Sequence, residues 1–352
     1  MLDPIAGWLV ILLSNGGYCL GDGPCTVDVQ WAADVEMPAA VVAWDVSYAH
    51  TVIADGRVLL AGRGAPTRIT LTLPPVRARI ALAWSYRLLR QCDAEVLATG
   101  SRTIEVYPTT EFARLAARLA GGRVLVLETA ATTALSRLLE DAGVAAHRVA
   151  ALAEVELQPA DVVLVGPERL RATRESDGPL LAAAENGAGV LMLVQRGVGQ
   201  VTGFEVRPCH VTVGAIWQTA HPALSDVPPD AWRSWLEGGE PVVSAVEVRA
   251  DDTTATELAY WPASCWERTP ATGMALIVEK KVGRGRLMLC QVPACANVDD
   301  PRTQRFLAAA LEYLATKARA VPVPVPESAR RVTQPIEVRN KVTWSSSGVD
   351  HE

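Results

Sequence analysis

The sequence is short of several residue types, and each shortage excludes a class of protein. Of its 33 basic residues only four are lysines, no basic block occurs, and 39 acidic residues give a net charge of −6. Nucleic acid and anionic membrane surfaces are therefore not expected partners. No run approaches the ~18 apolar residues that a membrane-spanning helix needs. Asp3 stands where a signal peptide would carry positive charge, so neither a signal peptide nor a transmembrane segment is predicted in this chain.

Cysteines are also few. Seven in 352 residues are too scattered for a disulfide scaffold, although Cys19 and Cys25 flank a turn-like stretch and could form one bridge in an oxidising compartment. Cys290 and Cys295 lack the second pair of ligands that zinc requires, so no metal site is predicted. The chain has neither a Gly-x-Gly-x-x-Gly at a strand-to-helix turn nor a Walker lysine motif, and no cofactor is expected.

Residues 1–108 contain short β-rich runs separated by turn residues, with no helical pattern between them. Within 68–73, Ile69 and Leu71 should lie on the face opposite Thr70. Dipeptides such as Asp55-Gly56 favour turns. This pattern predicts an antiparallel β-sandwich of the immunoglobulin type. The predicted strands are 8–13, 26–31, 40–46, 68–73, 79–84 and 103–107.

The pattern changes at Pro108, after which apolar strands alternate with helices. Continuous apolar strands of this kind predict a parallel sheet with helices on both faces. Residues 109–319 are therefore expected to form a three-layer α/β domain, flavodoxin-like or amidotransferase-like. Alternating Val and Pro from residue 321 predict an extended, Pro-rich tail over 320–352. The expected strands are 123–127, 161–166 and 190–194, with a hairpin of 274–279 and 286–291; the expected helices are 109–120, 132–142, 179–186 and 301–316.

Sheets of this kind can carry a nucleophile at the sharp turn after a strand. The two candidate turns, 165–168 and 194–197, contain neither Cys nor Ser. Cys209 and His210 are adjacent, but neighbouring side chains in an extended segment point to opposite faces. The acidic pairs show no spacing that places two carboxylates at the separation a glycosidase needs. No catalytic residue is therefore predicted in this chain.

Ten tryptophans against three phenylalanines is an unusual ratio. Four of the tryptophans and one tyrosine lie close together in a segment rich in proline and turns. Exposed aromatic rings suit sugar stacking or a protein interface, whereas the i,i+3 spacing of the first two also fits a packed core. The candidate carbohydrate or partner contacts are Trp232, Trp235, Tyr260, Trp261 and Trp266.

Several motifs carry a family resemblance. They are a Trp-bearing strand at Trp44, the Leu-Pro-Pro-Val step 73–76, the closing Ile-Glu-Val-Tyr-Pro of 104–108, His221-Pro222-Ala223-Leu224, the hairpin sequence 282–286 and Asp300-Pro301. Together, over about residues 40–316, they resemble the C-terminal accessory region of bacterial glycoside hydrolases of the β-galactosidase type. That region joins an immunoglobulin-like sandwich to a class I glutamine amidotransferase-like domain.

The resemblance implies a non-catalytic accessory or assembly region of a β-galactosidase-like glycoside hydrolase, acting in carbohydrate metabolism, with the catalytic barrel absent from this chain. The expected partners are that barrel or a second copy of the chain, and carbohydrate. Two alternatives stay open. One is a cysteine hydrolase of the amidotransferase class with a displaced nucleophile at Cys209, Cys290 or Cys295; the other is a stand-alone carbohydrate-binding protein. The resemblance carries over no catalytic residue, and it assigns no compartment.

Overall fold

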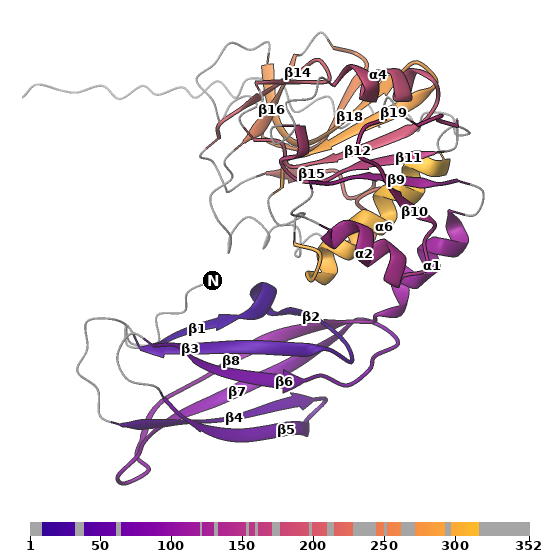
Figure 1. Ribbon diagram of the computed structural model, residues 1–352. Helices are drawn as coiled ribbons and strands as arrows, with labels where there is room; N and C mark the ends of the chain where they lie inside the picture. Colours follow the sequence, from indigo (N-terminus) through magenta and orange to yellow (C-terminus); the bar gives the residue numbers. More distant parts are fainter. Residues whose placement is uncertain are drawn as a thin grey trace, which may run out of the picture. The chain divides into compact units, whose positions relative to one another are not determined.

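The protein is mostly β-sheet with a few helices (Figure 1). The chain divides into the units Met1–Ala318 and Arg319–Glu352, and every described residue belongs to the first. The expected tail, 320–352, lies outside the described residues. Within the described ranges, no helix is long and apolar enough to cross a membrane. The computed structural model describes residues 9–31, 39–60, 65–119, 122–129, 133–152, 155–158, 161–170, 177–196, 199–209, 215–227, 244–249, 252–261, 272–292 and 297–316.

Two sheets formed by residues up to Tyr107 pack face to face around a common core. The smaller sheet is antiparallel and has the order β1 (Leu9–Leu13), β3 (Pro24–Trp31), β6 (Thr67–Thr72). The larger has the order β2 (Tyr18–Leu20), β8 (Val96–Tyr107), β7 (Ile80–Arg90), β4 (Ala40–Tyr48), β5 (Thr51–Leu59). Its pairs are antiparallel except that β2 runs parallel to β8, which the prediction of an all-antiparallel arrangement did not include.

Alternation along the strands identifies the core face correctly. In β6, Ile69 and Leu71 are buried whereas Thr70 is exposed. In β7, Trp84 is fully buried and its ring stacks on that of Tyr86, with 4.9 Å between the ring centroids. Because strand side chains alternate between faces, the apolar set of each strand contributes to the single core between the two sheets.

Strand β5 corrects the prediction for residues 51–59. Asp55-Gly56 lies inside this strand and not at a turn, since Gly56 pairs with Trp44 of β4. A Cβ atom on Gly56 would lie 2.7 Å from the Trp44 ring, so the glycine gives the indole its space. The turn of this hairpin is instead Ala49-His50, between the paired residues Tyr48 and Thr51.

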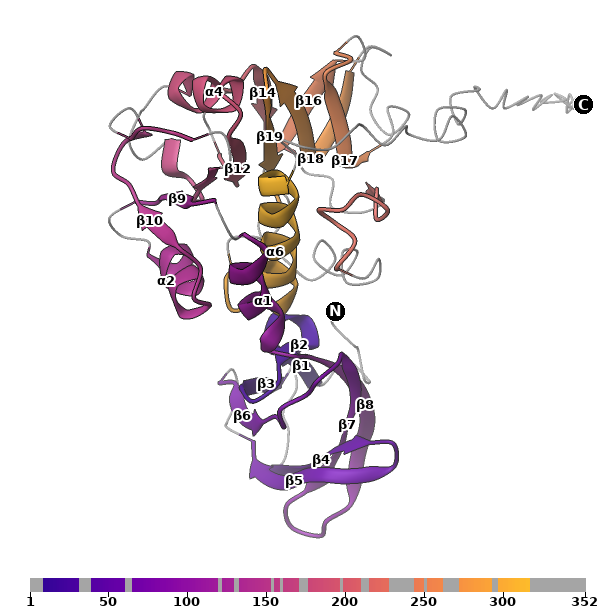
Figure 2. The same cartoon turned by 90° about the vertical axis from the view of Figure 1, so that its right-hand side faces the viewer.

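An eleven-stranded, curled sheet contains the remaining described strands (Figure 2). Its parallel part has the order β10 (Ala146–Arg148), β9 (Val124–Leu127), β11 (Val162–Val165), β12 (Gly189–Leu193), β19 (Gly285–Cys290). Antiparallel strands follow in the order β18 (Thr272–Val282), β16 (Ala245–Arg249), β14 (Phe204–Arg207), β13 (Gln200–Val201). The strand β17 (Ala255–Trp261) pairs with β18 and with β15 (Ile216–Trp217).

Helices cover both faces of the parallel strands. One core contains residues of α1 (Thr110–Arg118), α2 (Ala134–Asp141) and α6 (Pro301–Thr316), and the other contains residues of α4 (Gly178–Glu185). Strand β9 contributes Val124 and Val126 to the first core and Leu125 and Leu127 to the second. Because both faces are buried, the strand is continuously apolar.

Most elements expected after Pro108 are confirmed within a few residues. The last helix has the predicted bounds, and the Oδ1 atom of Asp300 accepts a hydrogen bond from the Arg302 N–H at 2.8 Å at its start. In the predicted hairpin, Val282 pairs with Gly285 and leaves a two-residue turn. The strands β10, β13, β14, β15, β16 and β17 were not predicted. The bridge that Cys19 and Cys25 could have formed in an oxidising compartment is absent, and both residues are buried thiols.

Candidate functional site

The carboxyl ends of the parallel strands form one edge of the large sheet. Counted along the chain, the five strands stand in the order 2-1-3-4-5, so the order reverses between β9 and β11. Open sheets of this kind bind ligands at the carboxyl edge, outside such a reversal. The charged and amide side chains that follow within three residues of the ends of these strands are Glu128, Glu168, Gln195, Arg196 and Gln291.

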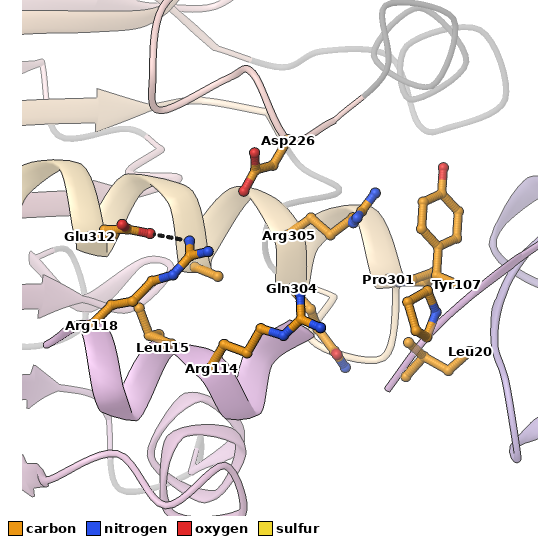
Figure 3. Close-up of a pocket in the computed structure, with 12 residues that line it drawn as sticks. Leu20, Tyr107, Arg114, Leu115, Arg118, Asp226, Pro301, Gln304, Arg305 and Glu312 are labelled. Carbon is orange, nitrogen blue, oxygen red and sulfur yellow. Dashed lines mark hydrogen bonds and ion pairs between the residues drawn. The ribbon is translucent and has the colours of Figure 1, made fainter. Parts of the chain in front are cut away.

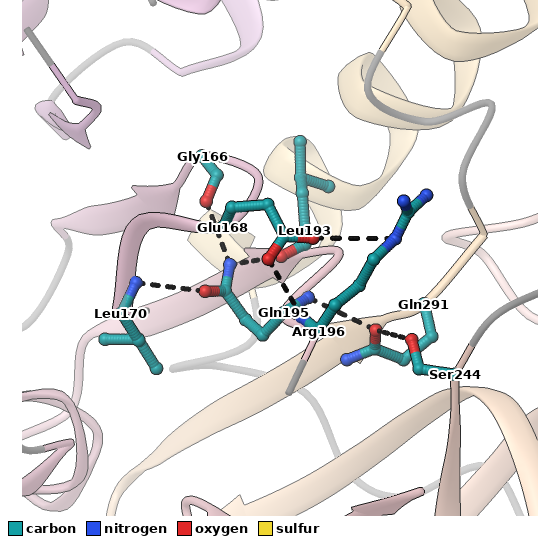
Figure 4. Close-up of polar contacts among 8 residues, drawn as sticks. All are labelled: Gly166, Glu168, Leu170, Leu193, Gln195, Arg196, Ser244 and Gln291. Atoms are coloured by element: carbon teal, nitrogen blue, oxygen red, sulfur yellow. Dashed lines mark hydrogen bonds and ion pairs between the residues drawn. The ribbon is translucent and has the colours of Figure 1, made fainter. Parts of the chain in front are cut away.

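Glu168 occupies the sharp turn after β11. Its φ angle is 57°, in the left-handed region that residues other than glycine rarely adopt. The Glu168 N–H donates to the carbonyl of Val194 at 2.8 Å, which ties the turn to the end of β12. Its carboxylate accepts the Arg196 N–H at 3.2 Å and lies 3.5 Å from Arg196 Nε (Figure 4). Both side chains are about one-third exposed and can contact a ligand.

Gln195 fixes the backbone around this turn. It is fully buried, and its Oε1 accepts the Leu170 N–H at 3.1 Å. Its Nε2 donates to the carbonyl of Gly166 at 2.9 Å and to that of Leu193. Every polar atom of the Gln195 side chain is therefore used inside the protein (Figure 4).

Gln291 extends the same network from β19. Its Oε1 accepts the Gln195 N–H at 3.2 Å and the Ser244 hydroxyl at 3.0 Å. Its Nε2 is buried and has no hydrogen-bond partner in the described part of the chain. A buried donor without a partner is rare in proteins.

Glu128, which follows β9, supports a helix. Its carboxylate accepts the backbone N–H groups of Leu135 and Ser136 at 2.9 and 3.2 Å, and the Ser136 hydroxyl at 2.5 Å. These are the unpaired donors of the first turn of α2, next to the positive end of its dipole. Glu128 is buried and accepts these three hydrogen bonds, so of the two carboxylates Glu168 is the one that is partly exposed.

A second polar cluster surrounds the buried carboxylate of Glu279 in β18. Tyr313 of α6 donates its hydroxyl at 2.9 and 3.0 Å to the two oxygens, Arg286 Nη1 of β19 donates at 2.8 Å, and His221 Nε2 lies at 3.3 Å. Burial pushes the pKa of Glu279 upward, but the hydrogen bond from His221 and the charge of Arg286 outweigh it and hold the pKa below its ordinary value. Three of the motifs singled out in the sequence, at 221–224, 282–286 and 300–301, contribute these partners or begin their elements.

The predicted aromatic contacts are only partly visible. Trp232, Trp235 and Trp266 lie outside the described residues. Trp261 is 1% exposed and packs in the core, so it offers no ring face to a sugar in this structure. Tyr260 is half-buried, and its hydroxyl accepts a hydrogen bond from Gln218 at 3.4 Å.

Two of the three cysteines proposed as displaced nucleophiles are described, and both are buried. Cys209 is 1% exposed, and Cys290, the last residue of β19, is fully buried. Cys295 and His210 lie outside the described residues. Glu168, Gln195 and Gln291 were not predicted as site residues, although each stands within three residues of the end of an apolar strand, and that position was the available signal.

Comparison with known proteins gives only distant similarity. No family model matches the chain, and no curated protein matches it. A domain of the outer membrane lipoprotein Omp28 from Porphyromonas gingivalis is 12% identical over 28% of this chain and 95% of that one, with a TM-score of 0.22. The CARDB domain of the PF1109 protein from Pyrococcus furiosus is 12% identical over 28% and 93%, with a TM-score of 0.21. A family 76 glycoside hydrolase from a bovine Bacteroides thetaiotaomicron strain is 12% identical over 32% of this chain and 23% of that one, with a TM-score of 0.22.

Proposed function

We propose that this chain is a non-catalytic accessory region that works with a glycoside hydrolase of the β-galactosidase type. The observation that carries the proposal is the turn after β11. Sheets of the amidotransferase type place their nucleophile at such a turn. Here the strained position holds Glu168, whose carboxylate accepts the backbone N–H of Arg196 and faces its guanidinium.

The side chains of Gln195 and Glu128 at this edge are also used in hydrogen bonds within the protein. Gln195 fixes the backbone of two turns, and Glu128 accepts the donors at the start of α2. The cluster around Glu279 joins a strand hairpin, a helix and the His221 segment through one carboxylate. These contacts favour a scaffold over a reaction centre.

The parallel strand order 2-1-3-4-5, with helices on both faces, supports the proposal of a flavodoxin-like or amidotransferase-like domain. The two sheets packed around one core support an immunoglobulin-like sandwich before it. These two domain types are the ones found together in the accessory region that the sequence motifs resemble. The partner in this proposal is a glycosidase barrel or a second copy of the chain.

The test has two parts. Sequencing the DNA on both sides of the coding region should identify a barrel to pair with the chain. The chain alone should not hydrolyse nitrophenyl galactoside or glutamine. When it is mixed with or fused to the barrel, the two should co-elute in size-exclusion chromatography, and the kcat/KM of the barrel should change.

Turnover by the chain alone would contradict the proposal. Rapid labelling of Cys209 or Cys290 by a disulfide reagent at pH 7 would favour the cysteine hydrolase instead, because an activated thiolate reacts fast near neutral pH. Denatured protein, in which all thiols are accessible, is the control for complete labelling.

A further inference from the structure

A cavity of about 210 Å³ lies between α1 and α6, beside the end of β8 (Figure 3). Its size is below the roughly 300–1,000 Å³ of pockets for drug-sized ligands, so it suits a molecule of about one sugar ring. Its wall combines arginines with a few other polar groups. The charged and amide side chains that line it are Arg114, Arg118, Asp226, Gln304, Arg305 and Glu312.

Among the side chains that line the cavity, three arginines stand against two acidic residues. Arg118 Nη1 is paired with Glu312 Oε2 at 2.6 Å. Arg114 precedes Arg118 by four residues on α1, which places two like charges on one helix face, an unfavourable arrangement without a counter-ion. Arg114 is exposed, and it makes no ion pair with any residue that the structure describes. Arg305 of α6 adds a further guanidinium to the lining, and Asp226 adds a carboxylate.

Tyr107, at the end of β8, contributes a second unusual feature. It is 1% exposed, and its hydroxyl has no hydrogen-bond partner among the described residues. The guanidinium carbon of Arg305 lies 4.9 Å from the centre of the Tyr107 ring. Burial raises the pKa of Tyr107 to about 12, so the hydroxyl remains a donor at neutral pH. A buried donor without a partner is unfavourable until an acceptor reaches it.

We propose that this cavity binds a small hydroxylated acid such as a sugar acid. Its carboxylate or phosphate faces Arg114 and Arg305, because guanidinium groups bind planar oxyanions through paired hydrogen bonds. Its hydroxyl groups donate to the Asp226 carboxylate and exchange hydrogen bonds with the Gln304 amide. The inference is independent of the proposed accessory role, since it rests on the cavity alone.

Isothermal titration calorimetry with galacturonate, galactose 6-phosphate, galactose and inorganic phosphate tests the proposal. One of the two sugar acids should bind at least tenfold more tightly than galactose, and the tighter of the two identifies the oxyanion. Equal binding of galactose, or no binding of either sugar acid, would overturn the proposal. Inorganic phosphate that binds as tightly as both sugar acids would overturn the assignment of a hydroxylated ligand.

Two variants assign the binding to this cavity. Arg114→Gln should weaken binding of the sugar acid about tenfold or more, whereas Arg137→Gln, at an exposed arginine on α2, should leave it unchanged. An equal loss in both variants would mean that only the overall charge matters, and the site would be wrong.

Tyr107→Phe separates a ligand contact from a structural contact. The variant keeps the ring and removes the unpartnered hydroxyl. The free protein should keep or raise its thermal midpoint, while affinity for the sugar acid falls at least threefold. Unchanged affinity would remove Tyr107 from the site, and a lowered midpoint would mean that the hydroxyl is used inside the protein.

Discussion

Glu279 shows how one buried charge holds three elements together. Replacing it with glutamine leaves Arg286 and His221 without their anion, and breaking a buried pair costs about 3–5 kcal/mol. Because glutamine still accepts from Tyr313, we expect Glu279→Gln to lower the free energy of unfolding by about 3 kcal/mol, measured by urea denaturation. Glu205→Gln is the matched control.

The control removes a carboxylate that is 46% exposed and paired with Arg207 on the surface, which is worth at most about 1 kcal/mol. Similar losses in the two variants would mean that the contacts of Glu279 add little to stability.

Glu168 permits a test of backbone strain. A left-handed conformation costs a residue with a Cβ atom about 1–2 kcal/mol, and glycine avoids this cost. Both Glu168→Gly and Glu168→Ala remove the contact with Arg196, so the difference between them isolates the backbone. We expect the glycine variant to be about 1 kcal/mol more stable than the alanine variant in urea, after allowing for the greater freedom of glycine in the unfolded chain. An alanine variant of equal or greater stability would show that the turn is not strained.

At the scale of elements, the hairpin of β4 and β5 has an unusual turn. Ala49 and His50 have φ angles of 46° and 69°, and two-residue turns with positive φ at both positions favour Asn-Gly. We expect the double variant Ala49→Asn, His50→Gly to raise the free energy of unfolding by about 1 kcal/mol. Ala49→Pro should lower it, because proline fixes φ near −65°. Thermal denaturation of the parent protein and both variants measures the effect. Midpoints equal to that of the parent would contradict it.

Gly285 marks a close approach between the start of β19 and the chain that joins α4 to β12. A Cβ atom there would lie 2.5 Å from the carbonyl oxygen of Ala184 and closer still to that of Ala188. These oxygens belong to the backbone, which cannot move aside as easily as the end of a flexible side chain. Gly285→Ala should therefore lower the free energy of unfolding by about 3 kcal/mol. Gly143→Ala, at φ 72° with open space around it, should cost only about 1–2 kcal/mol. Urea denaturation compares the two, and the reverse order would contradict this account.

Elements with strong local signals were predictable from the sequence. The last helix has Asp300 and Pro301 at its start, and the hairpin after β18 has glycines around its turn. Strand β5 was not predictable in the same way, since Asp55-Gly56 has the sequence of a turn. The choice of glycine there depends on Trp44, which lies on the neighbouring strand.

The candidate site was less predictable for a related reason. Gln195 and Gln291 are far apart in the sequence and meet only because β12 and β19 pair in a particular register. The sequence places each polar residue after an apolar strand but does not state which strands are neighbours. Glu168 could be located at a turn, whereas its positive φ required the fold.

At the scale of the whole molecule, the shifted pKa values of the carboxyl groups make the free energy of unfolding depend on pH. The pKa is lowered for Asp28, Asp93, Asp161, Asp252 and Glu279. The stability that these groups contribute is present above about pH 4 and is lost as the pH falls through their folded pKa values. Burial raises the pKa of Glu257, whose contribution has the opposite sign and is lost as the pH rises.

The pKa is lowered for five of these carboxyl groups and raised for one. We therefore expect the free energy of unfolding to decrease as the pH falls from about 4 to about 2. Urea midpoints at pH 7, 4 and 3 measure this fall. Glu279→Gln should show a shallower fall than the parent, because one of the titrating groups is gone. A midpoint that is constant over this range would contradict the assigned shifts.

The parallel sheet has a consequence for synthesis on the ribosome. Strand β12 leaves the ribosome about 90 residues before β19, its neighbour in the sheet. At ~5–20 residues per second this delay is about 5–20 seconds. During that time an apolar strand has an open edge that another chain could pair with. We therefore expect nascent chains that stop before residue 285 to depend on chaperones, and full-length chains to be released from them.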